Sequence, residues 1–362
     1  MVRIAIVGSG VVGAAIAYEL SLIPGWEITL LDRNLPADGS TGAALGVLMG
    51  IISRKTKGRA WRLRMASMER YPSLLKELTA KGFHVPHNSQ GILRLEFEPN
   101  YPENWEKLVA FRKTQGYRLE IWDSKQLRAK CHQVDSAVGA IYSPQDFQIN
   151  PRHLTTALIG AAESNGVTCQ FGVEVTDFLI ALTNEKQRCD RIITSDGELP
   201  VDWVVIAAGL GSLPLTTQLD STQELIPVLG QAIRVQLSGA IANFEPVISG
   251  DDVHIVPLGG GAYWVGATVQ FPEGAESPVA DSELMIKVWE RACQFYPALQ
   301  SGMIVESWTG LRPRPVNQSA PVLGPLAGYD NISLATGHYR NGVLLAPASA
   351  IAIRDQLLEA LA

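Results

Sequence analysis

Apolar and polar positions along the chain change between a strand-like and a helix-like period, and these changes outline the expected elements. The start of the chain predicts a strand at 4–7, a helix at about 12–22 and a second strand at 27–31. A further helix is expected at about 151–165, followed by a strand at 167–171. Alternation of this kind is typical of an α/β fold with a parallel sheet.

The pattern changes in the second half of the chain. An apolar run at 203–208 reads as a buried parallel strand, and the last helix is expected at about 342–361. Segments rich in β-branched and aromatic residues predict an antiparallel sheet at 227–235, 253–257, 262–268 and 303–308. We therefore expect a Rossmann-like α/β domain built from discontinuous segments and a second α+β domain. The expected division is 1–85, 145–225 and 310–362 for the first domain, and 86–144 and 226–309 for the second.

A glycine motif lies between the first strand and the first helix. Its sequence is Gly8-Ser9-Gly10-Val11-Val12-Gly13, a G-x-G-x-x-G pattern in the context that makes it specific for a dinucleotide. Gly8 permits the tight turn, Gly10 allows close approach of a pyrophosphate, and Gly13 allows the helix to pack against the sheet. Asp32 ends the second strand, where a carboxylate can bind ribose hydroxyls.

Composition and charge restrict the partners and the compartment. The chain has 362 residues, 46% of them apolar, and a net charge of −6, which argues against nucleic acid or an anionic membrane as the main partner. The one basic cluster is read as a solvated helix face: Arg54, Lys55, Lys57, Arg59, Arg62 and Arg64. The four cysteines show no metal or dithiol spacing, and the start lacks signal-peptide features. We expect a cytoplasmic enzyme without a transmembrane segment or metal, and a homo-oligomer remains open.

Motifs along the whole chain resemble the D-amino-acid oxidase superfamily, and within it the glycine oxidase branch. These motifs are the Gly8–Gly13 fingerprint with Asp32, the segments 40–47, 204–209, 227–231 and 310–313, and the run 335–347. The last run, Ala-Thr-Gly-His-Tyr-Arg-Asn-Gly-Val-Leu-Leu-Ala-Pro, is the most specific. The resemblance implies an FAD-dependent oxidoreductase in which the second domain covers the flavin.

The resemblance also implies where FAD binds. The expected contacts outside the fingerprint are Asp32, Arg33, Ser40, Thr41, Leu45, Gly46, Val47, Val175, Ala208, Gly209, His338, Tyr339, Arg340, Asn341, Gly342, Val343 and Leu344. Relatives with covalent flavin use a histidine in the early segment or a cysteine near the late strand. This chain has neither residue type at 40–46 or 301–342, apart from His338, so we expect noncovalent FAD.

The residue types of the loop at 337–342 indicate how it can interact with a flavin. It leads into the last helix, so the amides of Gly342, Val343 and Leu344 can point at one edge of a flavin ring. Donors and a helix dipole at that edge stabilise the negative charge of reduced flavin. Asn341 and Gly342 are expected at the start of this helix.

Three residues are expected at the substrate end. By resemblance, Arg312 and Arg340 bind the substrate carboxylate, because a guanidinium offers a planar fork of donors. His254 stands where glycine oxidase has a tyrosine, and we read it as a residue of the pocket wall rather than a base. Val269 and Val47 replace methionines, so glycine as the preferred substrate is in doubt.

The resemblance predicts oxidative deamination of a small amino acid or amine, with hydride transfer to flavin N5 and reoxidation by oxygen or another electron acceptor. Three alternatives stay open. The chain could be a D-amino-acid dehydrogenase that uses an acceptor other than oxygen, or a tRNA-modifying oxidoreductase, against which the acidic balance counts. It could also be a flavin-binding redox module without small-molecule turnover, against which Arg312 and Arg340 count.

Overall fold

A computed structural model describes residues 1–182, 187–221, 223–238, 242–274 and 276–361. The molecule has two halves in space, each built on one large sheet. The first half contains a six-stranded sheet in the order β19-β20-β13-β1-β2-β9, in which only β19 is antiparallel to its neighbour. The strands are β1 (Val2–Val7), β2 (Trp26–Asp32), β9 (Thr168–Phe171), β13 (Trp203–Ile206), β19 (Val322–Pro325) and β20 (Ile332–Thr336). Strands from the beginning, middle and end of the chain therefore form one sheet, as the sequence predicts.

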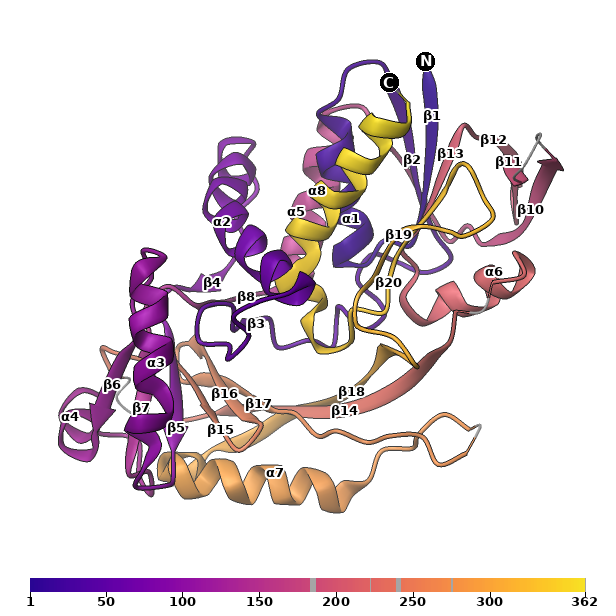
Figure 1. The fold of residues 1–362 in the computed structure, drawn as a ribbon. Helices are drawn as coiled ribbons and strands as arrows, with labels where there is room; N and C mark the ends of the chain where they lie inside the picture. Colours follow the sequence, from indigo (N-terminus) through magenta and orange to yellow (C-terminus); the bar gives the residue numbers. More distant parts are fainter. Residues whose placement is uncertain (183–186, 222, 239–241, 275, 362) are drawn as a thin grey trace.

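Layers on both faces bury this sheet. One face carries α1 (Val11–Ser21), α5 (Pro151–Ser164), α8 (Gly342–Ala360) and, farther out, α2 (Arg59–Ala80) (Figure 1). The other face carries a small antiparallel sheet and one short helix: β10 (Val175–Leu182), β11 (Gln187–Thr194), β12 (Gly197–Pro200) and α6 (Ser212–Gln218). The apolar sequence of β1, whose last four residues are all buried, reflects its central place between these layers.

An eight-stranded sheet forms the second half, in the order β18-β14-β17-β16-β15-β5-β7-β6. Its strands are β5 (Ile92–Glu96), β6 (Glu120–Asp123), β7 (Gly139–Ser143), β14 (Leu225–Gln236), β15 (Val247–Gly250), β16 (Val253–Gly259), β17 (Ala262–Gly266) and β18 (Met303–Pro315). All neighbouring pairs are antiparallel except β15 with β5. Helix α7 (Ser282–Phe295) lies along the outer face of this sheet (Figure 1).

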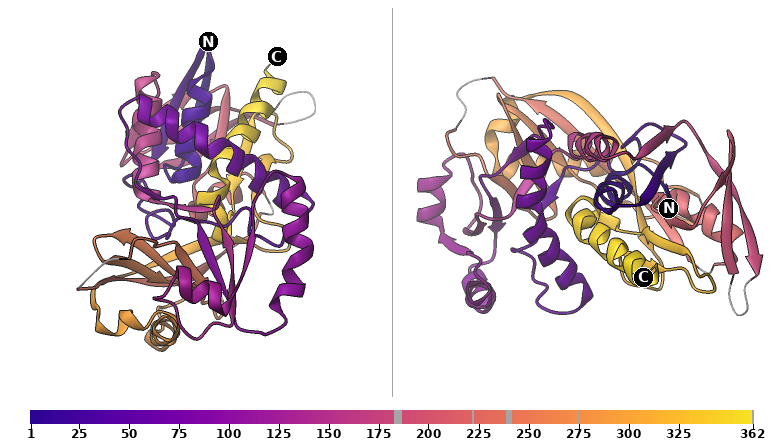
Figure 2. Two further views of the ribbon diagram at one scale, coloured as in Figure 1. Left: turned by 90° about the vertical axis from the view of Figure 1, so that its left-hand side faces the viewer. Right: turned by 90° about the horizontal axis from the view of Figure 1, so that it is seen from above.

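Three short strands form a separate small sheet, in the order β3 (Val47–Leu48), β8 (Phe147–Ile149) and β4 (His87–Asn88). The remaining elements are α3 (Tyr101–Thr114), α4 (Ser124–Lys130) and the 3₁₀ turns η1 (Gly209–Gly211), η2 (Pro297–Ser301) and η3 (Tyr339–Asn341). Figure 2 shows the sheets of the two halves packed one above the other, with both termini at the far end of the first half. The predicted α/β class with a second, antiparallel sheet is confirmed.

Two predictions about local structure are wrong. The strand predicted at 303–308 continues to Pro315, because β14 offers pairing partners along its whole length, so Arg312 lies inside a strand. The same strand runs through the predicted domain boundary at 309–310, and the division into domains stays a prediction. The basic cluster is not one helix face, because α2 begins only at Arg59, after Gly58 with φ +83°.

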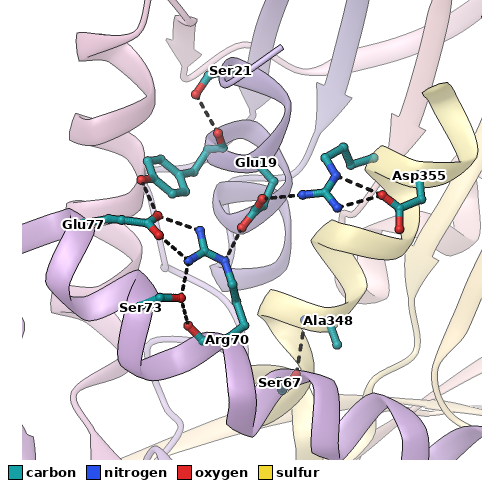
Figure 3. Close-up of polar contacts among 10 residues, drawn as sticks. Glu19, Ser21, Ser67, Arg70, Ser73, Glu77, Ala348 and Asp355 are labelled. Carbon is teal, nitrogen blue, oxygen red and sulfur yellow. Dashed lines mark hydrogen bonds and ion pairs between the residues drawn. The ribbon is translucent and has the colours of Figure 1, made fainter.

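A buried ionic network joins three helices. Arg70 of α2 binds Glu19 of α1 (2.8 Å) and Glu77 of its own helix (2.6 Å). Arg354 of α8 binds the same Glu19 (3.2 Å), whose side chain is only 4% exposed (Figure 3). Burial of a carboxylate between two guanidinium groups fixes the relative position of α1, α2 and α8.

Candidate active site

A cavity of about 850 Å³ runs between the two halves of the molecule. It is lined by these predicted site residues: Gly8, Gly10, Val11, Val12, Asp32, Arg33, Ser40, Thr41, Leu45, Gly46, Val47, Val175, Ala208, Gly209, His254, Arg312, His338, Tyr339, Arg340, Gly342, Val343 and Leu344. Gly13 and Asn341 are not part of this lining. The fold thus gathers residues from both ends of the chain around one space of the size that small-molecule sites have.

The glycine motif forms a tight turn at one end of the cavity. Gly8 has φ +114°, and a Cβ there would lie 2.6 Å from the Ala207 carbonyl oxygen. A Cβ on Gly13 would lie 1.8 Å from the Gly8 carbonyl oxygen, so no side chain fits at either position. A Cβ on Gly10 would point at Thr41 Oγ1, 3.2 Å away. Gly8 and Gly13 are needed for the turn itself, whereas Gly10 keeps the cavity wall open.

Asp32 and Thr41 hold the turn from the side. Asp32 Oδ2 accepts hydrogen bonds from the Ser9 amide (2.6 Å) and the Ser9 hydroxyl (2.9 Å). Thr41 Oγ1 accepts one from the Val11 amide (3.1 Å), which has no acceptor within the helix because it lies at the start of α1. Asp32 therefore orders the glycine turn while it lines the cavity. Arg33 pairs with Glu174 (3.3 Å) at the exposed rim.

The segment 40–47 crosses from one half of the molecule to the other. Ser40 Oγ donates to the Leu311 carbonyl (2.5 Å), and Trp308 Nε1 donates to the Ala43 carbonyl (3.0 Å), which fixes the segment on β18. A Cβ on Gly310 would lie 2.3 Å from the Cβ of Ala43. The segment 40–47 is thus a bent wall of the cavity, held by the strand that carries Arg312.

The start of α8 forms the opposite wall. Gly337 (φ +65°) and Tyr339 (φ +54°) turn the chain into η3, and Gly342, Val343 and Leu344 line the cavity where the helix begins. Asn341 occupies the N-cap position of α8, as predicted, but its side chain makes no cap hydrogen bond. Asn341 Oδ1 instead accepts a hydrogen bond from Arg64 Nη2 of α2 (3.0 Å).

Helix α8 contains a proline, and α2 compensates for it. Pro347 has no N–H to donate to the Val343 carbonyl four residues earlier. The hydroxyl of the buried Tyr71 donates to that carbonyl instead (2.5 Å). One turn earlier on α2, Ser67 Oγ accepts from the Ala348 amide (3.2 Å; Figure 3). The first turns of α8 therefore depend on α2 for their hydrogen bonds.

Arg312 is a half-buried cation in the cavity. Its Nη1 donates to the carbonyl oxygens of Leu229 and Thr268 (both 3.2 Å), and no carboxylate of the described chain pairs with it. A Cβ on Gly230 would lie 2.2 Å from its Nη2, so the guanidinium occupies the space above this glycine. Burial and then the nearby Arg340 lower the pKa of Arg312, which still remains charged at neutral pH. Two carbonyl dipoles hold the group, and its charge is left for an anion.

Arg340 differs from Arg312. Its side chain is 39% exposed, and its Nη1 lies 3.5 Å from Asp252 Oδ1. Asp252 lies in the two-residue turn between β15 and β16 with φ +63° and also lines the cavity. The structure brings Arg312 and Arg340 to one cavity, but Arg340 lies at its exposed edge with an acidic partner. Asp252 carried no sequence signal that could have separated it from other turn residues.

The two histidines of the cavity are both held neutral. Burial lowers the pKa of His254 to about 4. The charge of Asp252 acts in the opposite direction, whereas the charges of Arg340 and Arg312 lower the pKa further. Its Nδ1 is buried without a hydrogen-bond partner among the described residues. Burial also lowers the pKa of His338 to about 4, and the Nε2 atom of His338 lies 2.9 Å from Ser349 Oγ. Neither imidazole adds a positive charge at neutral pH.

Comparison with known proteins identifies the family. The model of the family described as "FAD dependent oxidoreductase" matches residues 3–356. The chain belongs to this family. It is 32% identical over 372 residues to the "Bifunctional protein ThiO/ThiG" of Trichormus variabilis, covering 98% of this chain and 52% of that protein. It is 27% identical to the glycine oxidase of Geobacillus kaustophilus, covering 97% of this chain and 92% of that protein.

Solved structures agree with this result. The crystal structure of glycine oxidase from Bacillus cereus superposes with a TM-score of 0.85 at 27% identity, covering 100% of this chain and 96% of that chain. The resemblance to the glycine oxidase branch, the oxidoreductase class and FAD as the cofactor are confirmed. The chain spans about half the length of the bifunctional relatives that it matches.

Two further expectations concern attachment of the flavin and membranes. The four cysteines are free, and none of them lines the cavity as far as the structure describes it. This arrangement is compatible with noncovalent FAD, which stays a prediction. Among the described helices, none is long and apolar enough to cross a membrane.

Proposed function

We propose that this FAD dependent oxidoreductase oxidises the carbon–nitrogen bond of a small amino acid whose carboxylate binds Arg312. The observation that carries the proposal is a half-buried guanidinium that faces the cavity without an acidic partner in the described chain. An unpaired charge in such a place is costly unless a ligand compensates it. A carboxylate matches the planar fork of donors, and the absence of a side chain on Gly230 leaves room for the guanidinium itself at the cavity wall.

The cavity has the features that FAD requires. We propose that the turn at Gly8–Gly13 and the start of α1 hold the pyrophosphate, and that Asp32 binds the ribose while Val175 lies beside the adenine. The wall that Gly10 leaves open supports this assignment, as does the start of α1, whose first amides have no acceptor within the helix. The segment 40–47 and the start of α8 would then hold the ring system. When bound, FAD supplies the acceptor for the hydride that leaves the α-carbon.

The chain's own residues would contribute binding and orientation. Arg312 fixes the carboxylate and thereby the direction of the α-hydrogen. Arg340 and Asp252 lie at the exposed edge, where Arg340 adds positive charge on the path of an anionic substrate. His254 is neutral and offers one donor and one acceptor without competing for the carboxylate. The amine loses one proton to solvent, and the imine product is hydrolysed by water to a keto acid and ammonia.

Substitution of Arg312 tests the proposal. Arg312→Lys keeps the charge but loses the fork, and Arg312→Ala loses both, so amino-acid binding should weaken in that order while FAD content stays normal. Loss of a buried charged contact costs about 2–5 kcal/mol, a factor of tens to thousands in kcat/KM. Arg234→Ala is the matched control, because Arg234 is exposed on the neighbouring strand β14.

The assay is anaerobic reduction of the bound flavin by glycine, sarcosine, proline and D-amino acids, followed by reoxidation with oxygen or an artificial acceptor. The first step measures amino-acid oxidation whichever acceptor is used, and the second separates oxidase from dehydrogenase. An amine without a carboxylate should react equally well with wild type and Arg312→Ala. Equal losses for both kinds of substrate, or no reduction by any member of the panel, would refute the carboxylate role of Arg312.

A further inference from the structure

Arg64 of α2 is a further cation for which the described residues provide no acidic partner. Its Nη1 donates to the Ala60 carbonyl (3.3 Å), its Nη2 to Asn341 Oδ1 (3.0 Å), and its Nε is buried without a hydrogen-bond partner. No carboxylate pairs with it in the described ranges. The exposed Arg62, two residues earlier, has the surroundings expected of a solvated helix face, and Arg64 does not.

The position of Arg64 is fixed from two sides. Arg64, Ser67 and Tyr71 follow each other at the spacing of one helix face, and all three bind the segment from Asn341 to Ala348 at the start of α8. The network of Arg70 with Glu19 ties the same helix to α1. A cation is thereby held at the helix end whose first residues line the cofactor cavity.

We propose that Arg64 is a positioning residue that raises the reduction potential of the bound FAD, by adding a fixed positive charge to the amide end of α8. The proposal rests on the assignment of the start of α8 to the flavin ring. A helix N-terminus already favours negative charge, and a full charge held behind it acts in the same direction. A half-buried charge is screened less by salt than an exposed one, so its effect persists in physiological buffer. Reduction adds negative charge to the cofactor, and this is the charge that Arg64 would stabilise.

The test compares Arg64→Met, Arg64→Gln and Arg64→Lys with Arg62→Met in the FAD-loaded protein. Two quantities are measured, the midpoint potential of the flavin and the dissociation constant of sulfite, an anionic probe whose binding bleaches the flavin. Neither needs an amino-acid substrate, so failure of the proposed substrate would not affect the result. FAD content and the thermal midpoint are recorded for every variant.

Arg64→Met and Arg64→Gln should weaken sulfite binding roughly tenfold, which corresponds to about 1.4 kcal/mol. The potential should fall by about 30 mV, the two-electron equivalent of that factor. Arg64→Lys should bring the sulfite dissociation constant to within about threefold of the wild-type value and the potential to within about 14 mV of it. Arg62→Met should leave both quantities unchanged. Wild-type values in Arg64→Gln would assign any effect of Arg64→Met to the lost hydrogen bond and overturn the proposal. Equal losses in Arg64→Lys, or in Arg62→Met, would overturn it as well.

Discussion

The hydrogen bond between Tyr71 and Val343 offers a sharp test of how α8 is held. Tyr71→Phe removes only the hydroxyl and keeps the ring, which packs edge-on against Phe147 with 5.4 Å between the ring centroids. The Val343 carbonyl would then lose its donor, because Pro347 cannot replace it. An unsatisfied buried carbonyl costs about 1–3 kcal/mol. We expect the free energy of unfolding to fall by that amount.

Pro347→Ala tests whether the Val343 carbonyl depends on Tyr71 because of the proline. It restores an N–H that can donate to the Val343 carbonyl within the helix, so the carbonyl no longer depends on Tyr71. In this background Tyr71→Phe should cost less than about 1 kcal/mol, and the two substitutions should show a clear coupling energy. The sign of the coupling follows from the geometry, whatever the effect of Pro347→Ala alone.

Urea denaturation of the wild type, the two single variants and the double variant measures the coupling energy. Free FAD is held constant and in excess for all four proteins. Tyr142→Phe is the matched control, because its hydroxyl also donates to a backbone carbonyl, that of Gln90 (3.0 Å), but at an exposed site where water can replace it. Its cost should stay within about 0.5 kcal/mol. Equal costs of Tyr71→Phe with and without Pro347 would show that the hydroxyl does not replace the missing helix hydrogen bond.

Three further outcomes are expected. Mild acid precipitation should release FAD and leave a colourless pellet; a pellet that stays yellow would show a covalent bond. Gly230→Ala would place its Cβ 2.2 Å from Arg312 Nη2, so kcat/KM for amino acids should fall about 10–100-fold at normal FAD content, and wild-type kinetics would contradict the position of the guanidinium. The pKa of His338, lowered by burial to about 4, means that the unfolded chain binds a proton more readily between pH 6.5 and 4, so stability is lost as the pH falls through this window. His338→Gln should reduce the loss between pH 7 and 5 by about 2 kcal/mol, and an unchanged pH dependence would refute this role.

The parts of the site that depend on local geometry could be predicted from the sequence. The glycine turn is one such part, because Gly8 and Gly13 are needed within a single strand–turn–helix unit. Four of the five parallel strands can be predicted from their apolar runs, because burial on both faces favours such runs, whereas β20 is not among the predicted strands. The full length of β18 cannot be predicted in this way, because its pairing with β14 extends beyond the apolar part of its own sequence.

Contacts between segments that lie far apart along the chain cannot be predicted from the sequence. Ser40 with Leu311 and Tyr71 with Val343 join residues 271 and 272 positions apart, and a single sequence contains no information that pairs them. A partial signal existed for Tyr71, since a proline inside a helix always leaves one carbonyl without its donor. That signal shows that a partner is needed but does not show which residue provides it.

The basic cluster shows why residue type alone cannot separate surface charge from functional charge. Arg62 and Arg64 are equal as sequence letters, and one charge in such a cluster is ordinarily solvated. Because the helix starts at Arg59, its turn directs Arg62 to solvent and Arg64, with Ser67 and Tyr71, to α8. Proline in α8 creates the need for polar groups on that face of α2, and the same face brings Arg64 to the end of α8 that lines the cavity. One stripe of α2 therefore both stabilises the first turns of α8 and places a cation beside them.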